Sequence, residues 1–188
     1  NILTEKVPVH DSGAIFIAAR KKNVRVVGPT SIGIISPGKA KVGSIGGEEP
    51  DRVFQKGHVG ILSKSGGMSS EIAWILKRKG LGHSTVVGVG GDLIACSNFA
   101  DLLVAFEQDE QTKAVVIFGE IGGVYEEQAA ALLATKQFTK PLAVFISGSF
   151  AEKLPRGARL GHAGAIIEHG RGTVSHKITE LEKAGALI

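Results

Sequence analysis

The sequence has little of several features that mark whole classes of protein. A single cysteine, Cys96, among 188 residues excludes an internal disulfide and fits a reducing compartment. No apolar run approaches the length of about 18 residues that a membrane span needs. Aromatic residues make up only 5% of the chain, and the basic residues behind its net charge of +4 are dispersed. We therefore expect neither a membrane nor a nucleic acid as partner.

The sequence also lacks the motifs of several common catalytic and nucleotide sites. It has neither a G-x-x-x-x-G-K-[ST] string nor a G-x-G-x-x-G string opening a βαβ unit, which argues against a P-loop and a dinucleotide site. The G-x-S-x-G turn of serine hydrolases is absent as well. No H-x-x-E-H spacing or Cys/His pair accompanies His162, so we expect no metal site.

Glycine is abundant: the chain has 26, about twice the usual share of about 7%. Short β-branched runs alternate with amphipathic stretches of helical period. The runs predict buried parallel strands over residues 24–27, 59–62, 85–89, 114–118 and 142–146. The amphipathic stretches predict helices over residues 11–22, 69–79, 98–107, 126–136 and 175–184. This alternation predicts an α/β fold, with a doubly wound parallel sheet between two layers of helices.

Residues 29–57 interrupt this rhythm. Their prolines and glycines exclude a long helix, so we interpret them as a connecting segment. The one helix and one strand before them are too few for an independent core. We therefore divide the chain into residues 1–47, the end of another domain with its connection, and residues 48–188, the main domain.

Three glycine-rich turns each follow a predicted strand, so they meet at the edge of the sheet where ligands bind. In the first turn, residues 63–69 read Ser-Lys-Ser-Gly-Gly-Met-Ser and lead into a helix. Small residues let backbone amides approach an anion at the positive end of a helix. The alternative is an ordinary strand-to-helix turn with Ser69 as the helix cap.

Two further residues suggest chemistry. Glu120 follows the strand predicted over residues 114–118, where its carboxylate could fix the tautomer of an imidazole. The alternative is an acid favoured by the dipole of the next helix. His162 stands between Gly161 and Ala163, and such small neighbours leave space for a tetrahedral group beside the ring. A neutral imidazole there could accept a phosphoryl group and pass it on; we interpret the other histidines as structural or exposed.

These strings together resemble the α-subunit of succinyl-CoA synthetase. The string Gly-Glu-Ile-Gly-Gly at residues 119–123 is followed about forty positions later by Gly-His-Ala-Gly-Ala-Ile-Ile at residues 161–167. Further matches run in the family's order from about residue 24 to the C-terminus, at residues 28–29, 34–38, 57–61, 63–66, 84–92 and 97–99. The resemblance implies a flavodoxin-like CoA-ligase domain over residues 48–188, preceded by the remnant of a Rossmann-type CoA-binding domain.

The resemblance also implies roles for particular residues. His162 would be phosphorylated during catalysis, with Glu120 as the residue that orients it. The phosphate would be held at a helix N-terminus by Ser65, Gly66, Gly67, Met68 and Ser69. A loop for substrate or phosphate would include Gly122, Gly123, Gly161, Asn98 and Phe99.

The implied reaction joins a carboxylate to CoA as a thioester, through an acyl phosphate. Its cofactors are CoA and ATP or GTP with Mg²⁺, the nucleotide being held by a β-subunit of ATP-grasp fold or by the equivalent part of a fused chain. The expected substrate is a dicarboxylate or tricarboxylate. Succinate is the first choice, and citrate or malate is the alternative because the turn at residues 65–71 is more similar to ATP-citrate lyase and citryl-CoA synthetase.

Two other interpretations remain. The chain could be a non-catalytic scaffold member of the family, or it could transfer phosphate through a histidine without CoA chemistry. We expect a cytoplasmic location, with a mitochondrial or other organelle matrix as the alternative.

Overall fold

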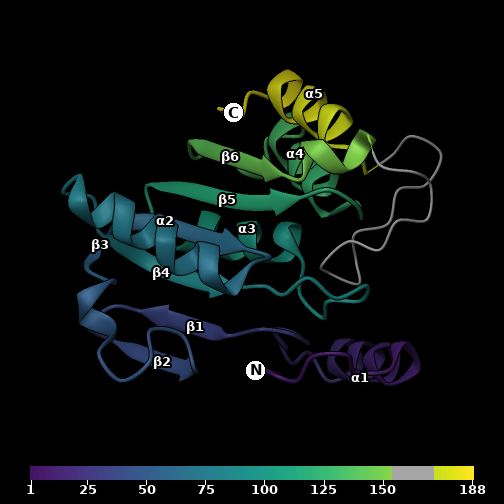
Figure 1. Cartoon of the computed structure of the whole chain (residues 1–188), viewed down its shortest axis with the longest axis horizontal. Coiled ribbons are helices and arrows are strands. Elements are labelled where there is room, and N and C mark those ends of the chain that lie inside the picture. Colours follow the sequence, from purple (N-terminus) through teal and green to yellow (C-terminus); the bar gives the residue numbers. More distant parts are fainter. Residues whose placement is uncertain (154–171) are drawn as a thin grey trace.

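The computed structural model describes residues 1–153 and 172–188, which form a six-stranded sheet flanked by helices (Figure 1). The strands are β1 (Gly33–Ser36), β2 (Ala40–Gly43), β3 (Lys56–Ser63), β4 (His83–Gly88), β5 (Ala114–Glu120) and β6 (Leu142–Ser147). The helices are α1 (Val9–Lys21), α2 (Gly66–Arg78), α3 (Phe99–Gln108), α4 (Tyr125–Ala134) and α5 (Val174–Ala184), with 3₁₀ turns η1 (Pro50–Arg52) and η2 (Ser149–Lys153). All five predicted helices are confirmed.

The strand order across the sheet is β2-β1-β4-β3-β5-β6. Neighbours among β4, β3, β5 and β6 are parallel. Numbered along the chain, these four follow the order 2-1-3-4, which begins the flavodoxin-like order 2-1-3-4-5. Leu187 makes a parallel bridge to Ala143 of β6, in the place of the fifth strand. The predicted flavodoxin-like α/β fold is confirmed for this part of the sheet.

The strand predicted over residues 24–27 is wrong. This segment is extended but pairs with no strand among the described residues. The carbonyl of Val27 accepts from the amide of Ile2 at 2.9 Å, and the carbonyl of Val26 accepts from the Ser97 hydroxyl at 2.6 Å. The apolar pattern reflects burial of Val27 in the core, which a loop segment can achieve without a β-ladder.

The segment at residues 29–57 contains a hairpin that the sequence analysis missed. β1 and β2 pair antiparallel, and β1 also pairs antiparallel with β4, so the sheet is mixed. A Pro-Gly turn joins the two strands: Gly38 has φ +74°, and the amide of Lys39 donates to the carbonyl of Ser36 at 2.9 Å. The proposed division at residue 47 stays a prediction, with this hairpin of its first part built into the sheet.

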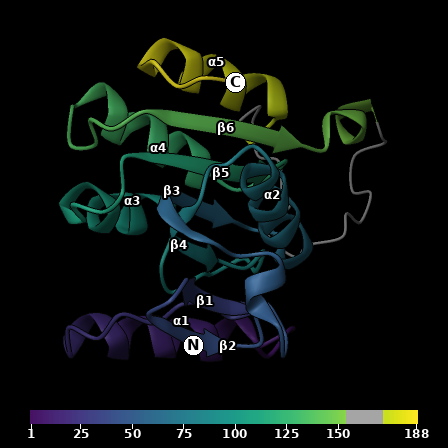
Figure 2. The same cartoon turned by 90° about the vertical axis from the view of Figure 1, so that its left-hand side faces the viewer.

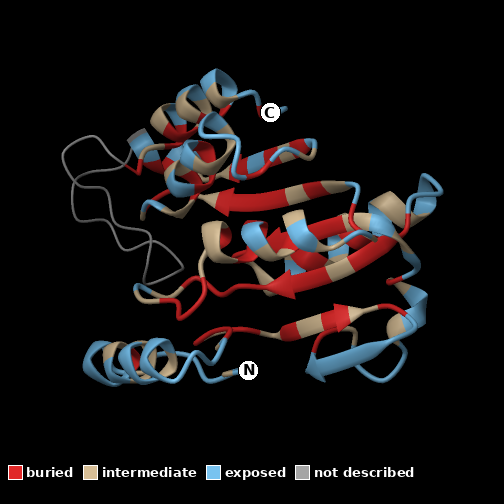
Figure 3. Cartoon of the chain, turned by 180° about the vertical axis from the view of Figure 1, so that it is seen from behind, coloured by how far each residue is buried: buried red, intermediate tan, exposed pale blue. Residues whose placement is uncertain are grey.

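Helices cover both faces of the sheet and create two cores. α2 lies on one face, and α3 and α4 lie on the other (Figure 2). The smaller core, under α2, contains Ile35, Ile45, Phe54, Ile61, Ala73 and Val86. The larger core joins α3, α4 and α5 to the opposite face, and its fully buried members include Leu62, Phe99, Leu103, Ile117 and Leu181. Burial is greatest in the central strands, whereas β2 and much of α1 are exposed (Figure 3).

α1 is attached at the border of this fold. Ser12 is its only buried residue, and Arg20 reaches Asp101 at the start of α3 in an exposed ion pair of 2.8 Å. Within the two described ranges, none of the helices combines the length and apolar character needed to cross a bilayer.

Candidate active site

The strand order reverses between β3 and β5. The predicted phosphate-binding residues 65–69 follow β3, and Glu120, Gly122 and Gly123 lie at the end of β5 or just after it. Ligands of open α/β sheets bind at such a switch point. Ser63 at the end of β3 is in register with Phe118, and the Lys64 amide donates to the Phe118 carbonyl at 3.2 Å. β5 continues to Glu120, which is in register with Ser147 of β6. The turn after β3 and the turn after β5 are therefore neighbours, as predicted.

The turn after β3 ends in a helix that starts earlier than predicted. Ser65 is the N-cap of α2, and its hydroxyl accepts from the Met68 amide at 3.4 Å. The buried Ser63 hydroxyl accepts from the Ser65 amide at 3.1 Å and donates to the Ser65 carbonyl at 2.6 Å. Ser69 is buried inside the first turn, where its hydroxyl donates to the Gly66 carbonyl at 2.6 Å. The alternative with Ser69 as the helix cap is thus wrong.

Two amides at this helix end are available to a ligand. The N–H groups of Gly66 and Gly67 donate to no partner among the described residues, because the first turn of a helix has no intrahelical acceptors for them. A Cβ at Gly66 would meet Ile32 at 2.6 Å, whereas a Cβ at Gly67 would meet no described atom within 4 Å. Gly67 thus presents open backbone at the positive end of α2, an arrangement that fits a phosphate group.

Glu120 lies at the other side of this edge, where a tight backbone positions it. Its amide donates to Glu126 Oε1 at 3.1 Å. A Cβ on the preceding Gly119 would lie 2.6 Å from the same oxygen, so only glycine lets the Glu126 side chain occupy that space. The turn continues through Gly122 and Gly123 with φ of +87° and +62°, in the left-handed region that favours glycine.

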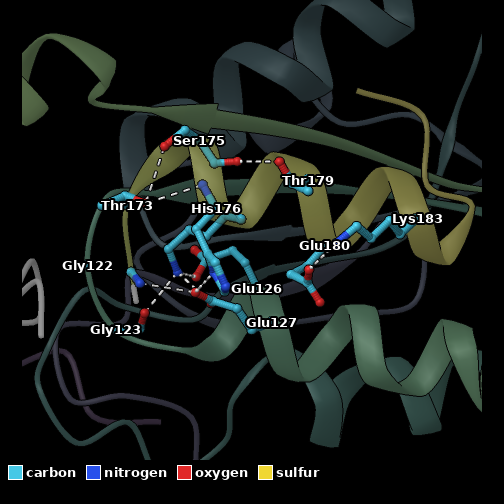
Figure 4. Close-up of polar contacts among 12 residues, drawn as sticks. Gly122, Gly123, Glu126, Glu127, Thr173, Ser175, His176, Thr179, Glu180 and Lys183 are labelled. Carbon is cyan, nitrogen blue, oxygen red and sulfur yellow. Dashed lines mark hydrogen bonds and ion pairs between the residues drawn. The ribbon is translucent and has the colours of Figure 1, made fainter. Parts of the chain in front are cut away.

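A group of four charged side chains, three of them buried and one partly buried, supports this turn, and the sequence analysis missed its role. We call it the Glu126 cluster: Lys64, Glu126, Glu127 and Lys177. Lys64 Nζ lies 2.8 Å from Glu126 Oε1, Lys177 Nζ contacts Glu126 Oε2, and Lys177 Nζ lies 2.9 Å from Glu127 Oε2. Both lysines also donate to the turn, Lys64 to the Gly122 carbonyl at 3.4 Å and Lys177 to the Gly123 carbonyl at 3.0 Å. Figure 4 shows Glu126 and Glu127 on α4 beside Gly122 and Gly123.

The pKa of Glu126 is lowered although its side chain is buried. Burial alone would raise the pKa of Glu126, but the ammonium groups of Lys64 and Lys177 beside it lower that pKa below its ordinary value. The Lys64 ammonium also lies 5.2 Å from the Tyr125 ring centroid and 5.9 Å from that of Phe99. Burial raises the pKa of the Tyr125 phenol, whose oxygen accepts from the Ala95 amide at 3.0 Å.

Asn98 and Phe99, predicted for the substrate loop, have structural roles in the described part of the chain. Asn98 is the N-cap of α3: its side chain accepts from the Asp101 amide at 2.9 Å, and Asp101 accepts from the Asn98 amide at 3.1 Å. Phe99 is fully buried in the larger core. These contacts account for both residues through packing and capping, and their place in a substrate loop stays a prediction.

His162 and Gly161 lie outside the described residues, so their predicted roles are not tested. The chain is described again from Gly172, whose carbonyl accepts from the Gly122 amide at 2.7 Å and whose amide donates to Glu127 at 3.2 Å. The segment that carries His162 therefore rejoins the described fold beside the turn that contains Glu120. The described residues include no group of three or more His, Cys, Asp or Glu side chains that could hold a metal ion.

Parts of the Glu126 cluster have signals in the sequence. Lys64 is the one charged residue among small ones in the turn after β3, and Glu126 follows the glycine turn directly at the start of a helix. Lys177 has no such signal, because it belongs to an amphipathic helix with several exposed charges, and only the structure shows that its side chain is buried.

The chain is similar to known proteins over almost its whole length. It is 47% identical over 187 residues to a succinate–CoA ligase (ADP-forming) α-subunit of Methanothermobacter thermautotrophicus, covering 100% of this chain and 61% of the relative. It is 43% identical over 189 residues to an ADP-forming sulfoacetate-CoA ligase subunit of Bilophila wadsworthia, with 99% and 62% coverage. The chain thus spans about three fifths of the length of these curated relatives.

A solved structure is also similar. ATP citrate lyase from Methanothrix soehngenii, in complex with citrate and coenzyme A, superposes with a TM-score of 0.93 at 32% identity, covering 98% of this chain and 31% of that one. Residues 62–187 match the family model described as CoA-ligase. This match, together with relatives above 40% identity, shows that the chain belongs to the CoA-ligase family.

Proposed function

We propose that this chain is the α-subunit-like part of an NTP-dependent acid–CoA ligase of the succinyl-CoA synthetase type. The observation that carries the proposal is the meeting of two features at the switch point. The open amides of Gly66 and Gly67 at the start of α2 lie on the turn that is hydrogen bonded to β5, the strand that ends at Glu120. An anion site and a carboxylate at one edge are what transfer of a phosphoryl group through a histidine requires.

In the proposed reaction, His162 carries the phosphoryl group between two steps. A ring nitrogen attacks the γ-phosphorus of the nucleotide, and the bond to the nucleoside diphosphate breaks. A carboxylate oxygen of the acid then attacks the same phosphorus, which breaks the P–N bond and gives an acyl phosphate. The CoA sulfur finally attacks the acyl carbon, and inorganic phosphate leaves as the thioester forms.

The described residues have two tasks in this scheme. Glu120 accepts a hydrogen bond from the second ring nitrogen of His162, which keeps the lone pair of the first nitrogen directed at phosphorus. The Gly66 and Gly67 amides donate to the phosphate oxygens, and the dipole of α2 offsets part of their charge. Ser65 keeps these amides in place as the helix cap.

We assign the nucleotide and its Mg²⁺ to a partner, either a β-subunit of ATP-grasp fold or the equivalent part of a fused chain. The turn at α2 offers hydrogen-bond donors, which suit an anion and not a cation, and the described residues contain no group of three or more side chains that could hold a metal ion. CoA would bind mainly to a Rossmann-type domain of which residues 1–47 are the end. Residues 48–188 would form the ligase domain, in a cytoplasmic enzyme.

We propose succinate as the acid, since relatives named as succinate–CoA ligase α-subunits are 45% and 47% identical to this chain. Citrate is the second candidate, because the similar solved structure is an ATP citrate lyase in complex with citrate. The Gly67-Met68-Ser69 sequence also favours this candidate. Both acids use the same phosphoryl-transfer residues, so they differ only in which acid accepts the phosphoryl group from His162.

The test uses the complex of the chain with its nucleotide-binding partner. The complex is labelled with nucleotide carrying a tagged γ-phosphate, the acid-labile label is mapped by mass spectrometry, and the label is then chased with CoA plus succinate, citrate or malate. We expect the label on His162, and its release as inorganic phosphate with formation of a thioester only when CoA and one acid are both present; that acid is the substrate. His162→Asn, a variant that removes the phosphoryl acceptor, is the matched control and should take up no label.

Three outcomes would contradict the proposal. Thioester formation by the His162→Asn variant would exclude the phosphohistidine step. The absence of any label on His162 would favour a non-catalytic scaffold. A label that leaves His162 for another acceptor in the absence of both CoA and an acid would favour histidine phosphotransfer.

A further inference from the structure

One carboxylate oxygen joins the two halves of the proposed site. Glu126 Oε1 lies 2.8 Å from Lys64 Nζ, and it accepts from the amide of Glu120 at 3.1 Å. Lys64 directly precedes Ser65, the cap of the phosphate-binding helix. A single oxygen atom thus links the turn that would hold the phosphate to the backbone of the residue that would orient His162.

The second oxygen links the same carboxylate to α5. Glu126 Oε2 accepts from Lys177, and Lys177 also donates to Glu127 and to the Gly123 carbonyl. Glu127 in turn accepts from the Gly172 amide at 3.2 Å and lies 3.5 Å from Nδ1 of His176. Glu126 therefore connects three segments that are distant in sequence: the turn after β3, the turn after β5, and the start of α5.

The burial of this cluster is costly and is not explained by stability alone. The side chains of Glu126 and Lys177 are 0% exposed, and that of Lys64 is 4% exposed. Buried ion pairs recover their desolvation cost only when their geometry is very good, and apolar residues of similar size often serve stability as well or better. Lysine contacts to Gly122 and Gly123 fix the path of a turn that needs two left-handed residues.

The glycine before Glu120 supports a positional role. A Cβ on Gly119 would lie 2.6 Å from Oε1 and 2.8 Å from Cγ of Glu126. Gly119 does not have a positive φ, so its backbone alone does not demand glycine. The close approach of the Glu126 and Ile146 side chains demands it instead, and the space that a Cβ would fill is occupied by the carboxylate bonded to the Glu120 amide.

We infer that Glu126 is a positioning residue: through the Glu120 amide and Lys64, it fixes the histidine-orienting carboxylate relative to the phosphate-binding turn. This inference rests on the proposed function. Glu126 acts through Glu120 and does not itself touch the transferred group. A displacement of about 1 Å in such a constellation costs up to about 100-fold in rate, so loss of Glu126 should slow phosphorylation of His162 strongly.

The test is a double-mutant cycle in the complex with the nucleotide-binding partner. The rate of acid-labile phosphate formation is measured for the wild type, Glu126→Gln, Glu120→Gln and the double variant. We expect Glu126→Gln to slow phosphorylation about 10- to 100-fold in the wild-type background, and less than about 3-fold when Glu120 is already glutamine. Equal slowing in both backgrounds, or no slowing in the wild type, overturns the inference.

A charge-balanced variant separates positioning from folding. Glu126→Gln alone leaves two buried ammonium groups with one carboxylate fewer. The double variant Glu126→Gln with Lys177→Met removes one charge of each sign. Lys64 then keeps its contacts with the Gly122 carbonyl and with the rings of Phe99 and Tyr125. If Glu126 positions Glu120, phosphorylation stays slow in this variant even where the unfolding transition has returned toward that of the wild type. Recovery of the wild-type rate together with stability would assign Glu126 a structural role only.

Lys140→Met is the matched control outside the site. Lys140 Nζ donates to the carbonyls of Phe106 and Asp109 at 2.6 and 2.7 Å, near the opposite ends of the strands. This variant should lower stability and leave the phosphorylation rate unchanged. Absence of label on wild-type His162 would overturn the proposed function together with this inference, whereas labelled wild type with equal slowing in both backgrounds overturns the inference alone.

Discussion

The two ends of the parallel strands carry charged groups of different kinds. At the carboxyl ends, the Glu126 cluster is buried, and its members bind one another and the carbonyls of a glycine turn. At the amino ends lies a second group, which we call the Lys140 cluster: Glu107, Asp109, Thr112, Thr139 and Lys140. Lys140 donates to carbonyls at the end of α3, and Glu107 accepts from the amide and hydroxyl of Thr139.

The difference lies in what each cluster satisfies. The Lys140 cluster caps the end of a helix and a loop that would otherwise have unpaired backbone groups, and its charged members stay partly exposed. Burial of the Glu126 cluster costs desolvation energy, and its lysines hold the turn at Gly122 and Gly123 in place. Charged groups at the amino edge thus serve ordinary backbone capping, whereas those at the carboxyl edge hold the glycine turn next to Glu120.

The largest expected effect comes from removing one lysine of each cluster. Lys177→Met leaves the fully buried Glu126 with one cation fewer and removes the cation beside Glu127, which should cost about 3–5 kcal/mol of unfolding free energy. Lys140→Met removes two hydrogen bonds that are partly exposed and should cost about 1–2 kcal/mol. Urea unfolding of both variants measures the difference. Equal losses would show that burial does not distinguish the clusters.

A steric change tests how closely the Glu126 cluster is packed, without removing a charge. Gly119→Ala places a methyl group within 2.6 Å of Glu126 Oε1 and 2.8 Å of Ile146 Cδ1, and such overpacking should cost about 1–3 kcal/mol. Gly13→Ala, in α1, meets no described atom within 4 Å and should stabilise by about 0.5–1 kcal/mol. Thermal unfolding of the two variants should therefore shift in opposite directions. A neutral Gly119→Ala would mean that Glu126 can move.

The caps of two helices at the carboxyl ends of the strands, Asn98 and Ser65, should contribute differently to stability and to phosphorylation. Asn98→Ala removes a capping box with hydrogen bonds of 2.9 and 3.1 Å and should cost about 1–2 kcal/mol. Ser65→Ala removes a single cap bond of 3.4 Å and should cost only about 0.5 kcal/mol. Denaturant titration compares the losses, and phosphorylation of His162 should slow only for Ser65→Ala. Slowing for Asn98→Ala instead would support the predicted substrate role of Asn98.

The smallest effect is a pH dependence at the amino edge. The hydrogen bonds from Thr139 lower the pKa of Glu107 below its ordinary value, so its contribution to stability is present above the unfolded pKa of about 4.3 and is lost as the pH falls through the lower folded pKa. Glu107→Gln should therefore be slightly less stable than wild type at pH 6, and this deficit should vanish toward pH 2. Thermal midpoints across that range measure it; a deficit that persists at the acid end would assign it to packing.

Local patterns in the sequence predicted much of the fold. The β-branched runs at residues 59–62, 85–89, 114–118 and 142–146 and the five helical patterns indicated their elements correctly, because burial of one face leaves a period that can be read directly. The strand predicted over residues 24–27 was wrong because a buried loop segment shows the same apolar pattern as a buried strand. The β1–β2 hairpin was missed because short strands among prolines and glycines differ little from a connection, although Pro37-Gly38 marks its turn.

For the site, the sequence placed Ser65, Gly66, Gly67 and Glu120 at one edge, which the strand order bears out. It could not show the Glu126 cluster, since the pairing of Lys64 with Glu126 and of Lys177 with Glu127 joins residues that meet only through tertiary packing. Charged residues on helices are usually exposed, so burial of Lys177 has no sequence signature.

We propose that Glu120, at the carboxyl ends of the strands, orients His162 for phosphorylation. The most direct test measures single-turnover phosphorylation of His162 in the complex with the nucleotide-binding partner, for wild type, Glu120→Gln and Lys140→Met. We expect Glu120→Gln to slow the step by about 100-fold, with unchanged assembly of the complex, while Lys140→Met phosphorylates at the wild-type rate. Equal rates for wild type and Glu120→Gln would show that Glu120 has no part in the mechanism and would contradict its proposed role in orienting His162.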